Sequence, residues 1–96
     1  MAIICPSVDD TLDERGRRYG KFVDVSKATI AIQSALYDQF HPNKLNTMPD
    51  DVAVALDMIC HKMARIAVGD MEYIDNWIDI AGYAQLVGDR LRGLER

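Results

Sequence analysis

The chain has 96 residues, of which 49% are hydrophobic and 27% charged, and its formal net charge is −4. This composition is typical of one soluble folded domain, and the length leaves no room for a second hydrophobic core. The acidic balance argues against binding duplex nucleic acid, which usually selects basic surfaces, but it permits a local basic pocket for a phosphorylated small molecule. No apolar run approaches the roughly 18 residues that a membrane span needs. We therefore expect a single domain over residues 1–96 that does not enter a membrane.

Cysteine usage and the first half of the chain indicate a reduced, helical protein. Two cysteines are too few for a disulfide framework or a zinc knuckle, which favours a cytoplasmic location. Pro6 predicts an extended lead-in over residues 1–7. A first helix is expected over 9–19, with acids early and bases late, and Gly20 as its C-cap. A second helix is expected over 25–40, and because apolar residues occupy more than one of its sides, it predicts contact with a second subunit.

The second half of the chain predicts two long antiparallel helices. Pro49 at a first helical position starts a helix that runs to Val68, with Cys60 on its apolar side. Gly69 ends it, and Asp70 is expected to cap a fourth helix that continues to Val87. No stretch shows the alternating pattern of a β-strand. The predicted fold is all-α, a small bundle of three to four helices that forms a homo-oligomer.

Polar side chains follow one edge of each of these two helices at a spacing of four residues. The two edges carry Asp57, His61 and Arg65 on one helix and Asp75, Asp79 and Tyr83 on the other. If both edges face one groove, the three carboxylates are suitable ligands for Mg²⁺ and His61 is a candidate general base. The alternative is that the two edges are simply solvated, with Asp79 paired to Arg65 or Lys62. The residues alone leave both readings open.

A second candidate site is the basic stretch RGRRYGK, in which Arg15, Arg17, Arg18 and Lys21 surround Tyr19. Arginine side chains match phosphate oxygens in a bidentate way, and an aromatic ring offers a base a surface for stacking. We expect Arg18, Tyr19 and Lys21 to take part in binding a nucleotide. The alternative is that these bases only neutralise the acidic residues 9–14.

Several stretches of the sequence resemble a known group of proteins. The pattern HKMARIAVGD-x6-NWIDIAGYAQLV, together with RYGKFVDV, resembles small bacteriophage proteins of unassigned function. The order of parts is more distantly similar to the MazG-type all-α nucleotide pyrophosphohydrolases. That resemblance implies Mg²⁺-dependent cleavage of a nucleoside triphosphate, with the metal held by an ExxE pair on one helix and an ExxD pair on the next. It also implies a location in the host cell cytoplasm.

Two of the four carboxylates expected from this resemblance are replaced. Asp57 and Asp79 match acidic positions of the motif, whereas Cys60 and Asn76 stand at the other two and Asp75 is the neighbouring acid. The enzymatic hypothesis assigns metal binding to Asp57, Asp75 and Asp79. It assigns activation of water to His61, and phosphate or base binding to Arg65, Lys62, Tyr83, Arg18, Tyr19 and Lys21. A second hypothesis is an accessory protein that sequesters a nucleotide or inhibits a host protein, which the missing carboxylates favour slightly. A third is a purely structural helical oligomer.

Overall fold

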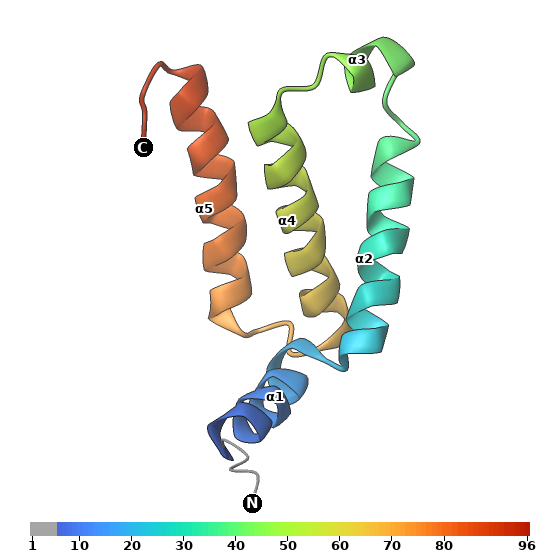
Figure 1. Cartoon of the computed structure of the whole chain (residues 1–96), viewed down its shortest axis with the longest axis vertical. Coiled ribbons are helices and arrows are strands. Elements are labelled where there is room, and N and C mark those ends of the chain that lie inside the picture. Colours follow the sequence, from blue (N-terminus) through green and yellow to red (C-terminus); the bar gives the residue numbers. More distant parts are fainter. Residues whose placement is uncertain (1–5) are drawn as a thin grey trace, which may run out of the picture.

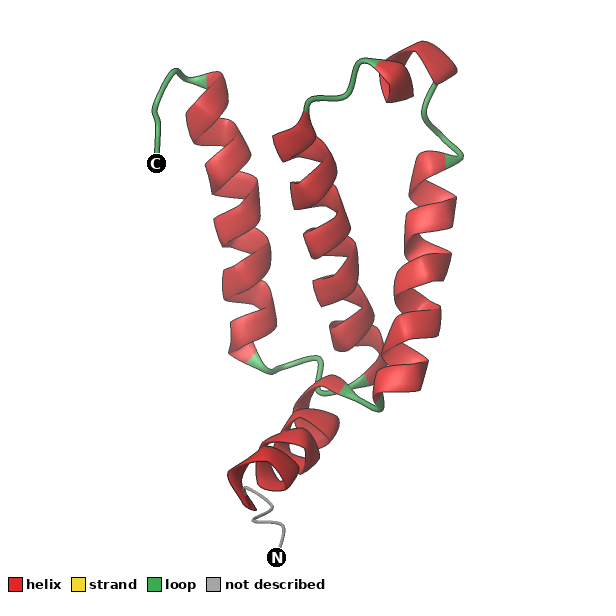
Figure 2. Ribbon diagram, viewed as in Figure 1, coloured by secondary structure: helices red, strands yellow, loops and turns green. Residues whose placement is uncertain are grey.

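The computed structural model of the protein describes residues 6–96. They fold into the five helices α1 (Pro6–Tyr19), α2 (Phe22–Tyr37), α3 (Pro42–Asn46), α4 (Asp50–Val68) and α5 (Ile74–Leu91). The three long helices α5, α4 and α2 lie side by side with α4 in the middle (Figure 1). Helix α1 lies at one end of this row, and α3 lies at the other end between α2 and α4, with no strand in the described part of the chain (Figure 2). The all-α prediction and the antiparallel pair of long helices are therefore confirmed.

The helices form the predicted small bundle, but its three long helices lie in one open layer with α4 in the middle. Helix α4 packs extensively against both α2 and α5, whereas α1 makes fewer contacts with either of its neighbours. The radius of gyration is 16.4 Å, while a compact domain of this length has a value of about 12–13 Å. Among residues 8–96, the buried apolar side chains are small, namely those of Val25, Ala55, Cys60 and Ala64. The prediction that Cys60 is buried is thus confirmed, and the core of one chain is thin.

The helix ends differ from the predicted ones in the first half of the chain. Pro6 lies inside α1, so residues 6 and 7 do not form the predicted extended lead-in; the rest of that lead-in, residues 1–5, lies outside the described residues. Proline lacks only a backbone N–H that the first turn of a helix does not use, so it is compatible with this position. Helix α2 begins at Phe22 and ends at Tyr37, three residues earlier than predicted at each end.

Helix α3 occupies a segment that was predicted to be a polar loop. Its N-cap is His41, whose Nδ1 accepts a hydrogen bond from the backbone N–H of Asn43 at 3.2 Å, and Pro42 follows at the first helical position. A histidine ring can replace the usual hydroxyl or carboxylate cap because its unprotonated nitrogen accepts a hydrogen bond. Helix α5 begins at Ile74, since Asp70 instead forms a turn in which its Oδ1 accepts a hydrogen bond from Glu72 N–H at 3.0 Å.

Two glycines join the α1–α2 turn to the α4–α5 turn. Gly20 has φ +89°, which confirms its predicted role at the end of α1. A Cβ atom added to Gly69 would lie 2.3 Å from the carbonyl carbon of Tyr19 and 2.6 Å from the carbonyl oxygen of Arg18. The backbone N–H of Asp70 donates a hydrogen bond of 2.8 Å to that same Arg18 oxygen. The two turns are therefore in direct backbone contact, which fixes α1 against one end of the helical layer.

Candidate functional site

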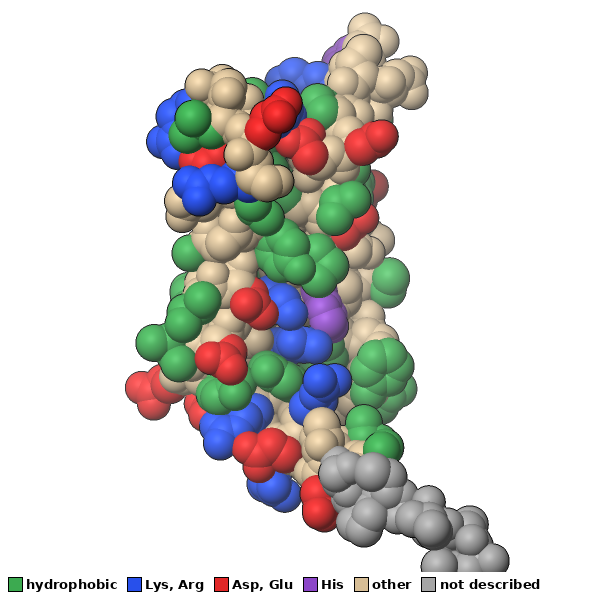
Figure 3. Space-filling model, turned by 60° about the vertical axis from the view of Figure 1, so that its left-hand side comes forward, with side chains coloured by type: hydrophobic (Ala, Val, Ile, Leu, Met, Phe, Trp, Pro, Cys, Tyr) green, Lys and Arg blue, Asp and Glu red, His purple; other side chains and the backbone are tan. Residues whose placement is uncertain are grey.

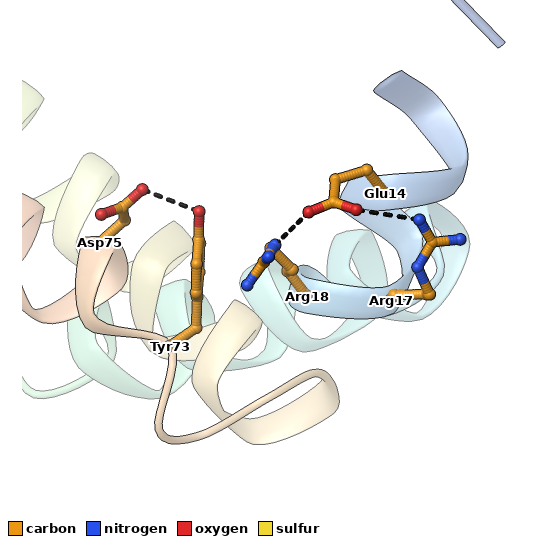
Figure 4. Close-up of polar contacts among 5 residues, drawn as sticks. All are labelled: Glu14, Arg17, Arg18, Tyr73 and Asp75. Carbon is orange, nitrogen blue, oxygen red and sulfur yellow. Dashed lines mark hydrogen bonds and ion pairs between the residues drawn. The ribbon is translucent and has the colours of Figure 1, made fainter. Parts of the chain in front are cut away.

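Arginine and tyrosine side chains stack on one another beside this glycine contact. The guanidinium of Arg65 lies 4.1 Å from the ring centroid of Tyr19, and the guanidinium of Arg18 lies 4.6 Å from that of Tyr73. The two tyrosine rings meet edge to face, with centroids 5.5 Å apart. In Figure 4, Arg18 lies between Glu14, with which it forms an ion pair, and Tyr73. These contacts connect α1, α4 and the start of α5. They hold both guanidinium groups in place, and Arg65 is held by a ring and not by a carboxylate.

A pocket of about 510 Å³ opens next to this stack, between α1, the start of α2 and α4. Its lining residues are Leu12, Arg15, Gly16, Tyr19, Gly20, Phe22, Val25, His61 and Arg65. No carboxylate is among them, although the protein as a whole is acidic. Figure 3 looks onto a face of the molecule where a histidine and several Lys and Arg side chains lie close together. The pocket therefore combines positive charge with an apolar floor, which is the chemistry that an anion with a ring requires.

His61 lies in this pocket and is partly buried. Its pKa is lowered below the usual 6.5, first by desolvation and then by the positive charges of Arg65 and Lys62. The imidazole is therefore neutral at neutral pH in the free protein. A bound anion would offset the repulsion and favour the protonated ring, so the group is suited to respond to a negatively charged ligand.

Asp57 lies away from the pocket, on the side of α4 that faces α2. Its Oδ1 accepts a hydrogen bond of 2.8 Å from the hydroxyl of Tyr37. Burial, followed by this hydrogen bond, raises the pKa of Tyr37 to about 12, so the hydroxyl keeps its proton and donates. The carboxylate of Asp57 therefore joins α2 to α4 and does not point toward the acids of α5.

The other two predicted metal ligands also have separate partners. Asp79 pairs with Lys62 across the α4–α5 contact, with a distance of 3.3 Å between Oδ2 and Nζ. The alternative reading of the sequence named this pairing as one of two, but it placed the pair on a solvated edge. The Lys62 side chain is instead almost wholly buried, so the pair connects the two helices. Asp75 accepts a hydrogen bond of 2.9 Å from the hydroxyl of Tyr73 at the start of α5.

The three carboxylates consequently do not form one site. Nowhere in the part of the chain that the structure describes do three His, Cys, Asp or Glu side chains gather as ligands of one metal ion. Asp57 and Asp75 accept hydrogen bonds from two different tyrosines, and Asp79 forms an ion pair with Lys62. His61 faces the pocket together with Arg65. These residues therefore do not fit the Mg²⁺ ion that the resemblance implies.

The remaining predicted binding residues divide between the pocket and other surfaces. Tyr19 and Arg65 line the pocket. Arg18 lies on the other side of α1, where it contacts Glu14 and Tyr73. Lys21 precedes α2, is exposed and is not among the lining residues. Tyr83 lies with Asp79 in a separate groove along α5.

Sequence reasoning placed Arg15 in the basic candidate stretch but gave no ligand-binding role to Phe22, and it did not predict that Asn76 is buried. Arg15 belongs to the predicted basic stretch, and Phe22 directly follows it, with 83% of its surface exposed beside the pocket. A large apolar residue next to a basic cluster was the available signal for Phe22. Asn76 is 1% exposed, and neither its side-chain oxygen nor its nitrogen has a hydrogen-bond partner. The helical pattern alone does not predict that a polar side chain such as Asn76 is buried, because buried polar groups normally have hydrogen-bond partners.

The fold and the pocket define a class of small all-helical protein with a cationic, aromatic-lined site. The sequence profile of the domain of unknown function DUF6378 matches residues 9–91, and the chain belongs to this family. A search of curated proteins and a search of solved structures found no match. No helix among the described residues is both long and apolar enough to cross a membrane.

Proposed function

We propose that this protein binds a small phosphorylated molecule that carries a ring, such as a nucleotide, in the pocket between α1 and α4. The observation that carries the proposal is the pocket lining, in which Arg15, Arg65 and His61 stand without a carboxylate. In a protein with a net charge of −4, such a lining concentrates positive potential in one concave site. This arrangement favours a dianionic phosphate over a neutral or cationic ligand.

The aromatic residues of the pocket suit the rest of such a ligand. Tyr19 is held by Arg65 on one side, and Phe22 is largely exposed at the edge of the pocket. A nucleobase gains about 1–3 kcal/mol when it stacks on an aromatic side chain. The volume of about 510 Å³ is within the range of pockets that hold small molecules. A ligand with both a phosphate and a ring therefore uses both kinds of lining residue.

The positions of the carboxylates support ligand binding without hydrolysis. Asp57 and Asp79 are hydrogen-bonded or ion-paired with Tyr37 and Lys62, away from the pocket. A general base or metal ligand must reach the reacting phosphate, and no carboxylate lines the proposed site. The proposal therefore retains the nucleotide ligand expected from the sequence but assigns the protein to sequestration of that ligand. Cleavage is not part of the proposal.

The test is a titration with AMP, ADP, ATP, adenosine and inorganic phosphate in the absence of metal. We expect the nucleotides to raise the melting temperature, because a ligand at about 100 times its Kd adds roughly 2.7 kcal/mol to stability. Adenosine and phosphate alone should bind more weakly than the nucleotides. Calorimetry should then show that Arg65→Met removes binding.

The matched control is Arg17→Met, which changes an arginine of α1 that is exposed and does not line the pocket. It should bind nucleotide as the wild type does. If none of the five compounds shifts the melting temperature at millimolar concentration, the proposal is wrong. Release of pyrophosphate from ATP with Mg²⁺ would instead support the enzymatic hypothesis.

A further inference from the structure

Helix α4 has one polar half and one apolar half. At about 100° per residue, all its charged residues and His61 lie within one half of the helix circumference. That half includes Asp57, which contacts α2, and Lys62, which contacts α5. The opposite half carries only apolar residues, among them Ile59 and Met63. The polar contacts of the layer are therefore on one face, and the central helix presents an apolar surface on the other.

The two outer helices continue this apolar surface. In α5, Asp79 contacts Lys62 on the polar face, so the positions about 140–160° away, Trp77 and Ala84, lie on the apolar face. In α2, Tyr37 contacts Asp57 on the polar face, and Ala28 and Ala35 lie on the opposite side. Asp24 is a charged residue at the end of this surface. We call the surface formed by Ala28, Ala35, Ile59, Met63, Trp77 and Ala84 the apolar face.

One chain leaves more surface uncovered than a stable monomer does. Its accessible surface is 7134 Å², whereas a folded monomer of this mass exposes about 5,500 Å². The excess is on the order of 1,000 Å² or more, which is at least the roughly 800 Å² per partner of a standard interface. Within the apolar face, Met63 is 43% and Trp77 is 53% exposed.

We propose that the apolar face is the interface with a second copy of this chain. Folded domains consist of at least two packed layers around a core, and one chain supplies a single layer with a thin core. The covering layer must therefore be present whenever the chain is folded, and another copy of the chain is always available. Alanines on α2 and α5 allow two layers to approach closely. The surface carries no charge except Asp24 at its end, so its middle can pack against itself without burying unpaired charges.

The wild-type protein provides the first test, by multi-angle light scattering and sedimentation at micromolar concentration. We expect a dimer or larger oligomer, with a melting temperature that rises with protein concentration. Trp77 is the only tryptophan, so its fluorescence reports on the apolar face. Its emission should be shifted to short wavelength and protected from acrylamide quenching, although the residue is half exposed in one chain.

A matched pair of variants on α4 then distinguishes its two faces. Met63 and Val54 are both exposed apolar residues, and nine positions of an α-helix place them on opposite sides of α4. Met63→Glu should dissociate the oligomer. If the chain folds only as an oligomer, the variant should also lose its helical circular dichroism. Val54→Glu should leave the molar mass and the Trp77 emission unchanged.

Several results would overturn the proposal. A wild-type protein that sediments as a folded monomer of 10.8 kDa would show that another partner, or none, covers the face. An oligomer that survives Met63→Glu but is lost in Val54→Glu would place the interface on the polar face. Exposed Trp77 in an oligomer would exclude α5 from the interface. Loss of folding in Met63→Glu supports the proposal only when the wild type is oligomeric and Val54→Glu folds.

Discussion

The two ends of the helical layer are held together by different kinds of interaction. At the α1 end, Gly20 and Gly69 bring two turns into backbone contact, and the Asp70 N–H donates to the Arg18 carbonyl at 2.8 Å. At the α3 end, Asp51 forms a bidentate ion pair with Arg90, with distances of 2.7 and 2.8 Å. Backbone contacts fix position more strictly than exposed charged side chains do. The candidate pocket lies at the end that the backbone holds, where its lining residues have a fixed geometry.

The largest expected effect is that of Gly69→Ala at the α1 end. The added methyl group would meet backbone atoms of Tyr19 and Arg18 at 2.3 and 2.6 Å, and these atoms cannot move without displacing α1. We expect a loss of about 2–3 kcal/mol in the free energy of unfolding, as for other overpacked sites. Chemical denaturation followed by circular dichroism measures it.

The matched control is Gly82→Ala inside α5. No atom lies within 4 Å of the Cβ position there, and alanine is favoured over glycine in a helix by about 1 kcal/mol. This variant should be more stable than the wild type. If both variants were equally stable, the close contact between the two turns would not exist in solution.

A smaller effect is expected for Tyr37→Phe, which removes the hydrogen bond between α2 and α4. The Asp57 carboxylate loses its donor. Because this bond is only part-buried, we expect a loss near the lower end of the about 1.5–3 kcal/mol that bonds to charged groups contribute. Because the pKa of Tyr37 is raised to about 12 in the folded state, its contribution is complete below pH 10 and is lost as the pH rises toward 12. Thermal melts between pH 8 and 11.5 should therefore show a steeper alkaline loss for the wild type than for Tyr37→Phe.

Asp57→Asn separates this structural role from metal binding. An amide oxygen still accepts the bond from the Tyr37 hydroxyl, so stability should change less than in Tyr37→Phe. Added Mg²⁺ should shift the melting temperature of neither the wild type nor Asp57→Asn. A Mg²⁺-dependent stabilisation that Asp57→Asn removes would contradict this arrangement of the carboxylates.

Most of the fold could be predicted from local sequence signals. The end of the central helix at Val68 and the role of Gly20 were predicted correctly, because glycine has a specific function at helix ends. The start of α5 was predicted too early, since Asp70 accepts from the second residue after it in a turn and so resembles a helix cap. Helix α3 was missed because its cap is a histidine, a residue with weak positional preference.

The site was harder to predict, because the sequence does not show how each helix is rotated about its own axis relative to its neighbours. Asp57 and His61 are four residues apart and were placed on one line, yet Asp57 contacts α2 whereas His61 lines the pocket next to α1. A helix in the middle of a layer has neighbours on both sides. Two side chains that differ by about 40° around that helix can therefore contact different neighbours. The Lys62–Asp79 pair was one of two pairings named in the alternative reading, because the short connection between the two helices makes them antiparallel neighbours.

A fourth prediction concerns His61 at the α1 end, where the effect depends on pH. The pKa of His61 is lowered in the folded state, so the unfolded chain binds its proton more readily and stability falls as the pH falls below about 6.5. A phosphate in the pocket reverses this preference and should be bound together with a proton. Calorimetry of AMP binding at pH 6.5 in two buffers of different ionisation enthalpy should show proton uptake. His61→Gln should lose that uptake, whereas His41→Gln, at the opposite end, should retain it.

The smallest effect is expected for Asp51→Asn at the α3 end. The pair with Arg90 is nearly half exposed, so solvent and salt screen it, and its loss should lower the melting temperature less than any destabilising variant above. The guanidinium holds the pKa of Asp51 below its usual 3.8, so the contribution is present above that pH and is lost on further acidification. Thermal melts at pH 7 with 20 mM and 1 M NaCl should show a difference between wild type and variant that vanishes at high salt. A large, salt-independent loss would mean that this end is held as firmly as the glycine contact, and the contrast between the two ends would fail.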